Sequence, residues 1–413
     1  MLTVLSSALP AALGTGDSID RGIIKPCGDP NAEAPALKAS SAILYSIDLD
    51  KAVYEKNADE KMPPYSITKL LTCYLALENL DPEQVVTASK NATKELEDGM
   101  ELELEPGEKL KAIDLIYASM LMSANDGATA LGEAVSGSEK EFIALMNKTV
   151  EEWGCKNTHF VNANGWEHKN HYTTARDMAI ITKNCLANDK LREISMTKKY
   201  TVPASNMSDP LKIENGFLKT MDNYKVLTGG KTGSWSETQC TIALEFADEG
   251  INAVIVLLGD TKKGREQDPR KIVEFAHDVT PGFVVTDSNK AVCEAWVKGG
   301  SKVKVPLDIK GLRYAYPANG KASGIRIKTE VDKLKAPLKK GDTAGKYYIY
   351  ANDQEVGKGR LYVGEDIEKG WFPSALYISN RKSLALLIAL VLILLLGFIL
   401  EKNKKKVLLS HAD

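Results

Sequence analysis

Two stretches of the chain place apolar residues at helical spacing. The first begins after Pro63-Pro64, and the second ends just before Ser123. In each stretch the apolar residues recur so that they share one face of a helix, which predicts two amphipathic helices. These residues are Leu70, Leu71, Tyr74, Leu75 and Leu77 in the first stretch, and Ile113, Ile116, Tyr117, Met120 and Leu121 in the second.

Strand patterns dominate the second half of the chain. Residues 240–246 and 253–258 are apolar runs joined by Asp248-Glu249-Gly250, which predicts two paired strands. Pro281-Gly282 and polar residues 286–290 then mark a domain boundary. Beyond it, four β-rich segments between Gly and Asp turns predict a small antiparallel sandwich in residues 285–375. These segments are residues 296–309, 323–331, 345–351 and 355–363.

The chain ends in a long apolar run. Residues 384–400 carry no charge, and with Ser383 they would extend roughly 27 Å as a helix, close to one hydrocarbon core. A buried core helix is the alternative, but the run has no polar face. More Lys follows the run than Lys or Arg precedes it, which places the tail 401–413 in the cytoplasm and the preceding domain outside. These charges are Lys402, Lys404, Lys405 and Lys406 after the run, and Arg381 and Lys382 before it.

Length and charge fit a protein of several domains. The 413 residues allow two or three domains, and a formal net charge of −2 argues against a nucleic-acid partner. A domain outside the membrane needs an export signal, yet residues 1–14 are only weakly apolar and no Lys or Arg precedes Arg21. We therefore expect a truncated start, with residues 1–37 forming a degenerate leader and a linker.

Three short strings carry the candidate chemistry. They are Ser66-Ile67-Thr68-Lys69, Ser123-Ala124-Asn125 and Lys231-Thr232-Gly233, in that order. Ser66 and Lys69 lie one helical turn apart at the start of the first predicted helix, so the amine can reach the hydroxyl, as an activated serine requires. Ser123 and Asn125 follow the second predicted helix and could both point into a cleft.

Each string alone has an ordinary explanation. The S-x-x-K pattern also occurs at Ser195, Ser301 and Ser379, and Ser66 with Lys69 could be a capping serine and a solvated lysine. The second string could be a helix C-cap, and Lys231 could be a turn lysine at a sheet edge. Glycines around Lys231 would nevertheless let a ligand lie against the strand backbone. The three strings in one order, each in a suitable local setting, favour catalysis.

With these strings the chain resembles the low-molecular-weight penicillin-binding proteins that act as serine-type D-alanyl-D-alanine carboxypeptidases. The resemblance is close over residues 38–280 and looser over 285–375, where the family carries a small β-rich domain. Further matching segments are residues 46–72, 125–133, 142–147, 162–165 and 172–178. The resemblance implies an α/β (α+β) fold: an antiparallel sheet flanked by helices, a helical subdomain that holds Ser123, and a β domain. The apolar run at residues 383–400 would be a transmembrane form of the family's anchor.

The resemblance also assigns roles to residues of the first two strings. Ser66 would be the acylated nucleophile, and Lys69 would take its proton as a free amine with a lowered pKa. Ser123 would relay a proton to the leaving D-alanine. Asn125 would hydrogen-bond the substrate's peptide group.

The third string would bind the substrate's terminal carboxylate. Lys231 and Thr232 would hold it, and Gly233 would allow its close approach. Backbone N–H groups of Ser66 and Ser234 would form the oxyanion hole, where one such donor is commonly worth about 3–4 kcal/mol. The family implies no cofactor and no metal. Its substrates are peptidoglycan stem peptides, and β-lactam antibiotics acylate the same serine.

The sequence departs from the family pattern in three places. Ala124 stands where glycine is common, Gly229-Gly230 replaces the more usual pair before the lysine, and residues 236–239 replace an alanine-glycine pair. The last change adds a carboxylate, Glu237, near the expected cleft rim. These departures put the substrate preference in doubt more than the reaction.

Two rival functions remain open at this point. A class A β-lactamase would share the three strings, but no E-x-x-L-N segment lies between Asn125 and Lys231 to supply its deacylating carboxylate. A catalytically idle wall-binding protein would follow if residues 236–239 had spoiled the cleft. The five histidines suggest no Ser-His-Asp set, which leaves a lysine as the base.

The six cysteines allow disulfides outside the membrane. Cys73, on the first predicted helix, and Cys240, at the start of a core strand, are expected instead to be small buried side chains. Cys155 and His159 have the spacing of metal ligands on a helix. No second ligand pair accompanies them, so a zinc site is not expected.

Overall fold

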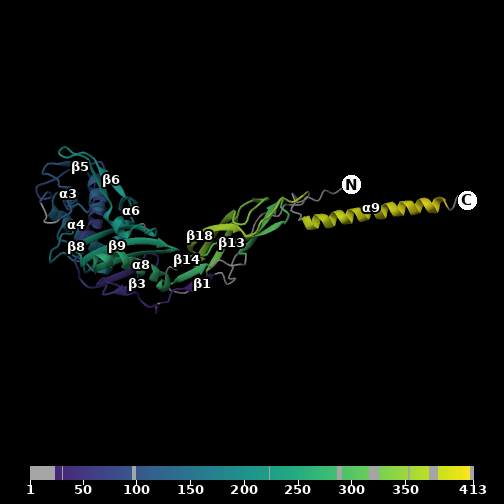
Figure 1. Cartoon of the computed structure of the whole chain (residues 1–413), viewed down its shortest axis with the longest axis horizontal. Helices are drawn as coiled ribbons and strands as arrows, with labels where there is room; N and C mark the ends of the chain where they lie inside the picture. The colour runs from purple at the N-terminus through teal and green to yellow at the C-terminus, as the bar shows by residue number, and fades with distance from the viewer. Residues whose placement is uncertain are drawn as a thin grey trace. The chain divides into compact units, whose positions relative to one another are not determined.

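The computed structural model describes residues 24–29, 31–94, 99–222, 224–285, 291–315, 325–351, 354–371 and 380–409. These residues form two compact units, and each is described by itself (Figure 1). The first unit holds Cys27–Gly282. The second holds residues 24–26 and, apart from Ala315, the described residues from Phe283 onward.

A five-stranded antiparallel sheet is the centre of the first unit. The strand order is β3-β2-β10-β9-β8, so β3 and β8 are the edge strands. The apolar runs 240–246 and 253–258 lie within β9 and β10, as predicted. The strands are β2 (Ser41–Ser46), β3 (Lys51–Lys56), β8 (Leu227–Ser236), β9 (Gln239–Asp248) and β10 (Ile251–Asp260).

The two central runs are continuously apolar because both faces of the sheet are covered. Successive side chains of a strand point to opposite faces. On β10, Val254, Val256 and Leu258 belong to the core on one face, and Ala253, Ile255 and Leu257 to the core on the other. A strand buried on both sides therefore reads as an unbroken apolar run rather than an alternating one.

Helices build the layers on both sides of the sheet. The larger core is built mainly with α1 (Lys69–Asn79), α2 (Ala112–Leu121), α3 (Asn125–Ser136), α4 (Glu139–Glu152), α5 (Ala175–Leu186) and α6 (Asp189–Ser195). The core on the other face is built with α7 (Gly216–Met221) and α8 (Lys262–Val279). The predicted arrangement of an antiparallel sheet flanked by helices is confirmed.

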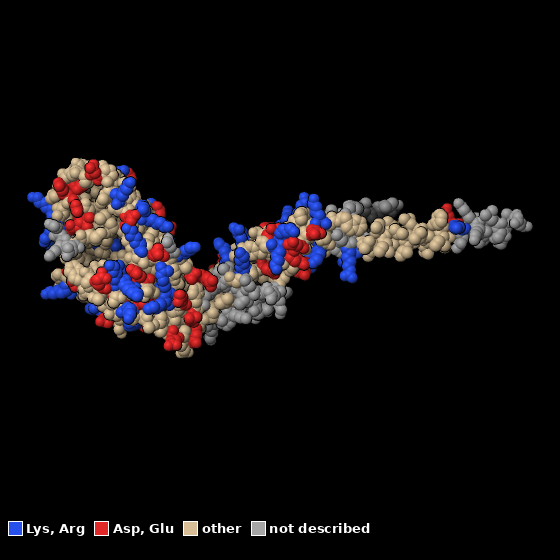
Figure 2. All heavy atoms as spheres, viewed as in Figure 1, with Lys and Arg blue, Asp and Glu red and all other residues tan. Residues whose placement is uncertain are grey.

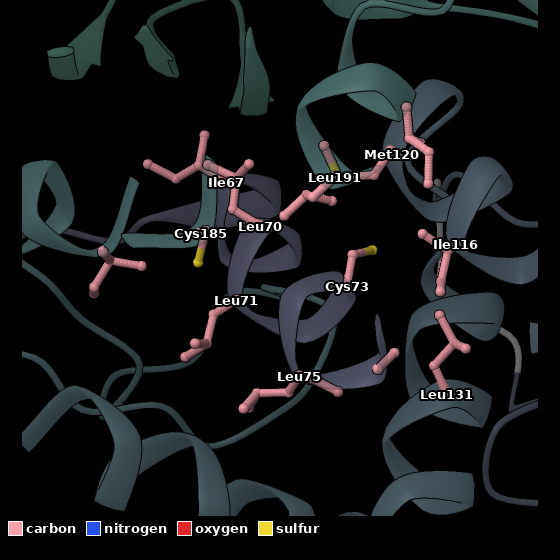
Figure 3. Packing of buried hydrophobic residues seen from close by; sticks show 14 of the residues in the cluster. Ile67, Leu70, Leu71, Cys73, Leu75, Ile116, Met120, Leu131, Cys185 and Leu191 are labelled. Carbon is pink, nitrogen blue, oxygen red and sulfur yellow. The ribbon is translucent and has the colours of Figure 1, made fainter. Parts of the chain in front are cut away.

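Helix α1 lies inside the larger core. Leu70, Leu71, Cys73 and Leu75 are buried, and Figure 3 shows their side chains among apolar groups of the neighbouring helices. The labelled neighbours are Ile116 and Met120 of α2, Leu131 of α3, Cys185 of α5 and Leu191 of α6. Burial of one leucine side chain contributes about 1.5–3 kcal/mol, so this packing fixes α1 and with it the residues at its N-terminal end.

Short elements complete the first unit. A 3-10 turn, η1 (Tyr65–Thr68), leads directly into α1. Two small hairpins pair β4 (Val85–Thr87) with β5 (Lys109–Lys111), and β6 (Lys199–Val202) with β7 (Leu211–Glu214). Ser123 lies between α2 and α3 in the helical part of the unit.

The second unit is rich in β-strands, as predicted. Its main sheet has the order β15-β17-β18-β13-β12-β16, and a three-stranded sheet has the order β1-β11-β14. The strands are β1 (Ile24–Cys27), β11 (Gly282–Val285), β12 (Cys293–Lys298), β13 (Lys304–Ile309), β14 (Leu312–Ala315), β15 (Arg326–Val331), β16 (Leu334–Lys335), β17 (Thr343–Ala351) and β18 (Gln354–Val363).

Two details of this unit differ from the prediction. The pairing is not purely antiparallel, because β12 and β16 run parallel at Val297↔Leu334. Ile24–Cys27, expected in an irregular linker, forms strand β1. Its backbone groups pair with another strand, a long-range partner that local sequence patterns do not reveal. The expected leader in residues 1–23 lies outside the described residues.

The C-terminal apolar run lies in one long helix, α9 (Asn380–Leu409). Its stretch Leu384–Lys402 is long and apolar enough to cross a membrane, and none of it is buried against the rest of the protein. The space-filling view shows a tan segment with charged atoms only toward its ends (Figure 2). Among the described helices no other passes this test of length and composition.

Candidate active site

The first string sits where a 3-10 turn meets a buried helix. Ser66 is in η1, and Lys69 is the first residue of α1. Two contacts hold the turn: the Thr241 hydroxyl donates to the Pro64 carbonyl at 2.8 Å, and Gly165, at φ +85°, packs against the Tyr65 carbonyl. A Cβ on Gly165 would lie only 2.1 Å from that oxygen, so this close approach requires glycine.

Lys69 is fully buried and has three partners. Its Nζ lies 2.6 Å from Asn125 Oδ1, 2.5 Å from the Asn164 carbonyl oxygen and 3.1 Å from Ser66 Oγ. The first two atoms can only accept hydrogen bonds, so each takes one N–H of the amine. The position that faces Ser66 is then free to carry the lone pair of a neutral amine.

The surroundings of Lys69 favour that neutral form. Burial removes the ammonium ion from water, and the nearby charge of Lys231 adds repulsion. Together they hold the pKa of Lys69 well below its ordinary value of 10.5, although Cys73 and Asp126 oppose this shift. The lowered pKa expected for Lys69 from the sequence agrees with its burial and with the nearby charge of Lys231.

The second string bridges two helices. Helix α2 ends at Leu121, and α3 begins at Asn125. Asn125 is therefore the first residue of α3 and not a C-cap of α2. Ser123 between them has φ +70°, a left-handed conformation that costs a residue other than glycine about 1–3 kcal/mol. This conformation places Ser123 Oγ 3.1 Å from Lys231 Nζ. Asn125 is buried, and its side-chain oxygen is held by Lys69.

Lys231 brings the third string to the second. It lies on the edge strand β8, is almost fully buried, and donates to Ser123 Oγ and to the Thr232 carbonyl at 2.9 Å. Burial lowers the pKa of Lys231 to about 7; a contribution from Cys73 opposes this, and the charge of Arg265 adds to it. Thr232 is half-buried, and Ser234, further along the strand, is exposed.

Gly233 lets the edge strand lie directly against η1. A Cβ at this position would meet the Ser66 backbone nitrogen at 2.8 Å and Thr241 Oγ1 at 2.5 Å, closer than side chains normally approach. The Gly233 carbonyl accepts a hydrogen bond from Arg265 at 2.9 Å. All three strings therefore converge: Lys69 joins the first to the second, Lys231 joins the second to the third, and Gly233 packs on Ser66.

The variant Gly233→Ala should disturb this convergence. The added methyl group must push β8 away from η1, and overpacking of this kind costs about 1–3 kcal/mol of unfolding free energy. A small displacement of reacting groups can also lower turnover about a hundredfold. Urea unfolding would measure the first effect, and turnover of the substrate that the family resemblance implies would measure the second.

Gly216→Ala is the matched control for that substitution. Its Cβ would meet nothing closer than the Leu121 carbonyl at 3.6 Å, an ordinary contact. If Gly233→Ala were as stable and as active as Gly216→Ala, the close packing of β8 on η1 would have no role.

Sequence patterns missed some supporting groups. The Asn164 carbonyl contacts Lys69, a contact that the resemblance of residues 162–165 to the family does not indicate. The Asp126 carboxylate accepts from the backbone N–H groups of Leu102 and Leu104 at 3.0 and 3.1 Å, which ties that segment to the start of α3. The Asn-Gly pair at 164–165 indicates a turn, but no local pattern predicts that the Asn164 carbonyl contacts Lys69.

The departures from the family pattern remove none of these groups. Ser236 pairs with Gln239, so Glu237 and Thr238 form the turn between β8 and β9. The exposed Glu237 carboxylate lies 2.9 Å from Lys262 Nζ. Ala124 is buried beside the second string.

Ser195, which begins another S-x-x-K copy, and the Cys155–His159 pair have different surroundings, and Ser379 lies outside the described residues. Ser195, at the end of α6, donates to the Arg192 carbonyl at 2.8 Å. The Cys155 thiol donates to the Asp177 carbonyl, and His159 Nδ1 lies 2.7 Å from the Asn170 carbonyl oxygen. Within the described part of the chain, no group of three or more His, Cys, Asp and Glu residues is placed to hold a metal ion.

The antiparallel fold with its three strings is that of the penicillin-binding hydrolases of the cell wall. Residues 29–262, more than half of the chain, match the peptidase S11 family model, described as D-alanyl-D-alanine carboxypeptidase. The chain belongs to this family of D-alanyl-D-alanine carboxypeptidases. Residues 283–369 match the C-terminal domain of penicillin-binding protein 5.

Individual relatives agree with this assignment. The chain is 29% identical over 345 residues to D-alanyl-D-alanine carboxypeptidase DacF of Bacillus subtilis, covering 82% of this chain and 88% of that protein. It is 28% identical over 356 residues to DacC of Escherichia coli, with 82% and 87% covered.

Solved structures give the same result. Penicillin-binding protein 5 from Haemophilus influenzae aligns with a TM-score of 0.56 at 26% identity, over 82% of this chain and all of that one. The Streptomyces K15 DD-transpeptidase aligns with a TM-score of 0.53 at 26% identity, over 59% of this chain and 98% of that one. The resemblance inferred from the sequence strings is confirmed.

Proposed function

We propose that this hydrolase is a membrane-anchored serine DD-carboxypeptidase that removes the terminal D-alanine from peptidoglycan stem peptides through an acyl-enzyme. The observation that carries the proposal is the arrangement around Lys69. Two hydrogen-bond acceptors, from Asn125 and Asn164, hold two N–H groups of its buried amine, and the third position faces Ser66 Oγ at 3.1 Å. A neutral amine so oriented can accept the hydroxyl proton.

Acylation then follows from the positions of these groups. Lys69 Nζ takes the proton of Ser66, and Oγ forms a bond to the carbonyl carbon of the D-Ala–D-Ala peptide. The backbone N–H groups of Ser66 and Ser234 would stabilise the negative oxygen of the tetrahedral intermediate. The C–N bond breaks, and terminal D-alanine leaves as the amine after it gains a proton.

The Ser123–Lys231 pair supplies that proton and the recognition of substrate. Lys231 donates to Ser123 Oγ, so the hydroxyl can pass a proton to the leaving nitrogen and be reprotonated from the ammonium group. Lys231 and Thr232 would bind the terminal carboxylate, whose charge favours the protonated form of Lys231. Asn125 would hold the peptide group on the acyl side. Water then attacks the ester carbonyl and gives a proton to the Ser123–Lys231 pair, the C–O bond to Ser66 breaks, and the proton held by Lys69 returns to Ser66 Oγ.

A β-lactam would acylate the same serine, because its ring amide and carboxylate resemble the D-Ala–D-Ala end. The test of the whole proposal uses the full-length protein in detergent, with a stem pentapeptide and a fluorescent penicillin as probes. Release of D-alanine together with a long-lived covalent label supports it. Rapid turnover of the penicillin would favour a β-lactamase instead, and peptide binding without D-alanine release would favour an idle wall-binding protein.

Helix α9 is the proposed membrane anchor. Its apolar stretch Leu384–Lys402 has the length of one membrane crossing. The positive charges after residue 401 outnumber Arg381 and Lys382 before the stretch, so we place the C-terminus in the cytoplasm and the catalytic domain outside. This orientation puts the proposed active site on the side of the membrane where peptidoglycan lies.

Deletion of residues 380–413 should therefore move the protein from the membrane fraction to the soluble fraction of a cell lysate. The reason is that no other described helix could span a membrane. Ultracentrifugation and immunoblotting would measure the distribution. Deletion of residues 410–413 alone leaves α9 intact and is the control. If the protein that lacks residues 380–413 stayed in the membrane pellet, α9 would not be the anchor.

A further inference from the structure

Three aromatic rings lie together beside the nucleophile. Tyr65 precedes Ser66, and its ring lies nearly parallel to that of Trp235, at an interplanar angle of 14° and a centroid distance of 6.3 Å. Trp166 meets Trp235 edge-on, at 74° and 4.9 Å. Tyr65 is buried and Trp166 is half-buried, whereas Trp235 leaves 43% of its surface exposed. An exposed indole in such a cluster is a surface on which an apolar group could stack.

Each ring is attached to backbone that builds the site. The β8–β9 register shifts between Ser234 and Ser236, so Trp235 is the extra residue of a β-bulge. Bulges re-aim side chains, and this one accompanies the stacking of the indole over Tyr65. Trp166 follows Gly165, which packs on the Tyr65 carbonyl, and it lies two residues beyond Asn164, whose carbonyl holds Lys69. The rings are therefore fixed relative to Ser66.

The direction of the substrate along β8 leads to this cluster. In the proposed function the terminal carboxylate lies at Thr232 and the scissile carbonyl at Ser234. The acyl part of the peptide must then continue toward Trp235. An extended peptide advances about 3.3 Å per residue, the same as the strand. The residue that precedes D-alanyl-D-alanine therefore lies beyond Ser234, on the side of Trp235.

We propose that Trp166 and Trp235, supported by Tyr65, form a binding site for the side chain of the residue before D-alanyl-D-alanine. The occupant is the long aliphatic stem of a diamino acid, which can lie in the corner between the two indoles. This inference rests on the proposed function and deepens it, because it names a determinant of substrate preference that the three catalytic strings do not contain.

The test compares two substrates of the full-length protein in detergent. They are Nα-acetyl-L-Lys-D-Ala-D-Ala and Nα-acetyl-L-Ala-D-Ala-D-Ala, which differ only in the side chain that would meet the indoles. The parent protein should release D-alanine with a kcat/KM roughly tenfold higher for the lysine substrate. In Trp235→Ala and in Trp166→Ala this ratio should fall toward one, whereas Trp235→Phe should keep most of it.

Controls separate the possible failures. Trp296→Ala removes an exposed tryptophan of the β-rich unit and should leave the ratio unchanged. Labelling of each variant by fluorescent penicillin shows that its site is still assembled. A parent protein that cleaves both substrates equally well, or alanine variants that keep the parent ratio, would overturn the side-chain site alone. No D-alanine release from either substrate would overturn the proposed function and this inference with it.

Discussion

Ser66→Ala should abolish both D-alanine release and covalent labelling by a fluorescent penicillin. The substitution removes the atom that we propose forms the ester, and loss of a catalytic serine elsewhere lowers kcat by about a millionfold. The fold should persist, because the packing of η1 depends on Pro64, Tyr65 and Thr68 contacts and not on the Ser66 hydroxyl. The measurements are D-alanine release from a stem pentapeptide and fluorescence of the protein band on a denaturing gel.

Ser301→Ala is the matched control for this experiment. Ser301 begins another S-x-x-K copy, Ser301–Lys304, and lies in the β-rich unit. The Ser301→Ala protein should be labelled by the fluorescent penicillin and should release D-alanine at the same rates as the parent. If Ser66→Ala were labelled as strongly as the parent, or if Ser301→Ala lost its labelling, the nucleophile would lie in a different S-x-x-K copy from the one assigned.

Lys69→Met should lower acylation by about a thousandfold while leaving Ser66 in place. Methionine is similar in length but has no amine, so Ser66 would lose its proposed general base, a contribution of roughly 10²–10⁴ to the rate. The measurement is the second-order rate of penicillin labelling. Lys90→Met, which replaces an exposed lysine, should be labelled at the same rate as the parent. Labelling of Lys69→Met at the parent rate would exclude Lys69 as the base.

The same variant should change how stability depends on pH. The folded-state pKa of Lys69 is below its ordinary 10.5, so between these two values the unfolded chain binds one proton more than the folded chain. The free energy of unfolding therefore rises with pH over this range, by about 1.4 kcal/mol per pH unit for such a group. Lys231, with a pKa of about 7, adds a similar rise above pH 7.

Lys69→Met removes one of these two contributions. Between pH 8 and 9.5 the unfolding free energy of the variant should rise less steeply with pH than that of the parent, because the pKa of Lys69 in the folded protein is held well below 10.5. Urea unfolding at the two pH values measures the difference, with Lys90→Met again as the control. Equal slopes in parent and variant would mean that Lys69 is charged in the folded protein.

Much of the fold could be read from local patterns. The apolar runs of β9 and β10, the apolar face of α1 and the long apolar stretch of α9 all lie where the hydrophobic pattern places them. Such patterns work because each element must bury its own apolar face. Pairing between strands far apart in the sequence could not be predicted in this way. Strand β1 and the parallel β12–β16 pair depend on distant partners that no local pattern identifies.

The candidate site divides in the same way. Ser66, Lys69, Ser123 and Lys231 could be listed from their strings, and the structure brings their side chains into two hydrogen-bonded pairs. The supporting groups could not be listed. The carbonyl of Asn164 is a backbone atom, and its use depends on where its segment packs rather than on its side chain.

The sequence by itself determined which groups can react and which segments are apolar, because both properties belong to individual side chains and their spacing. Only the tertiary structure decided the state of Lys69, since burial and the nearby Lys231 lower its pKa. It also decided the stacking of Trp166 and Trp235 beside Ser66, because two indoles 69 positions apart meet only when β8 and the 162–166 segment pack on the same turn. Desolvation and proximity arise when the chain is folded, and the order of residues does not contain them.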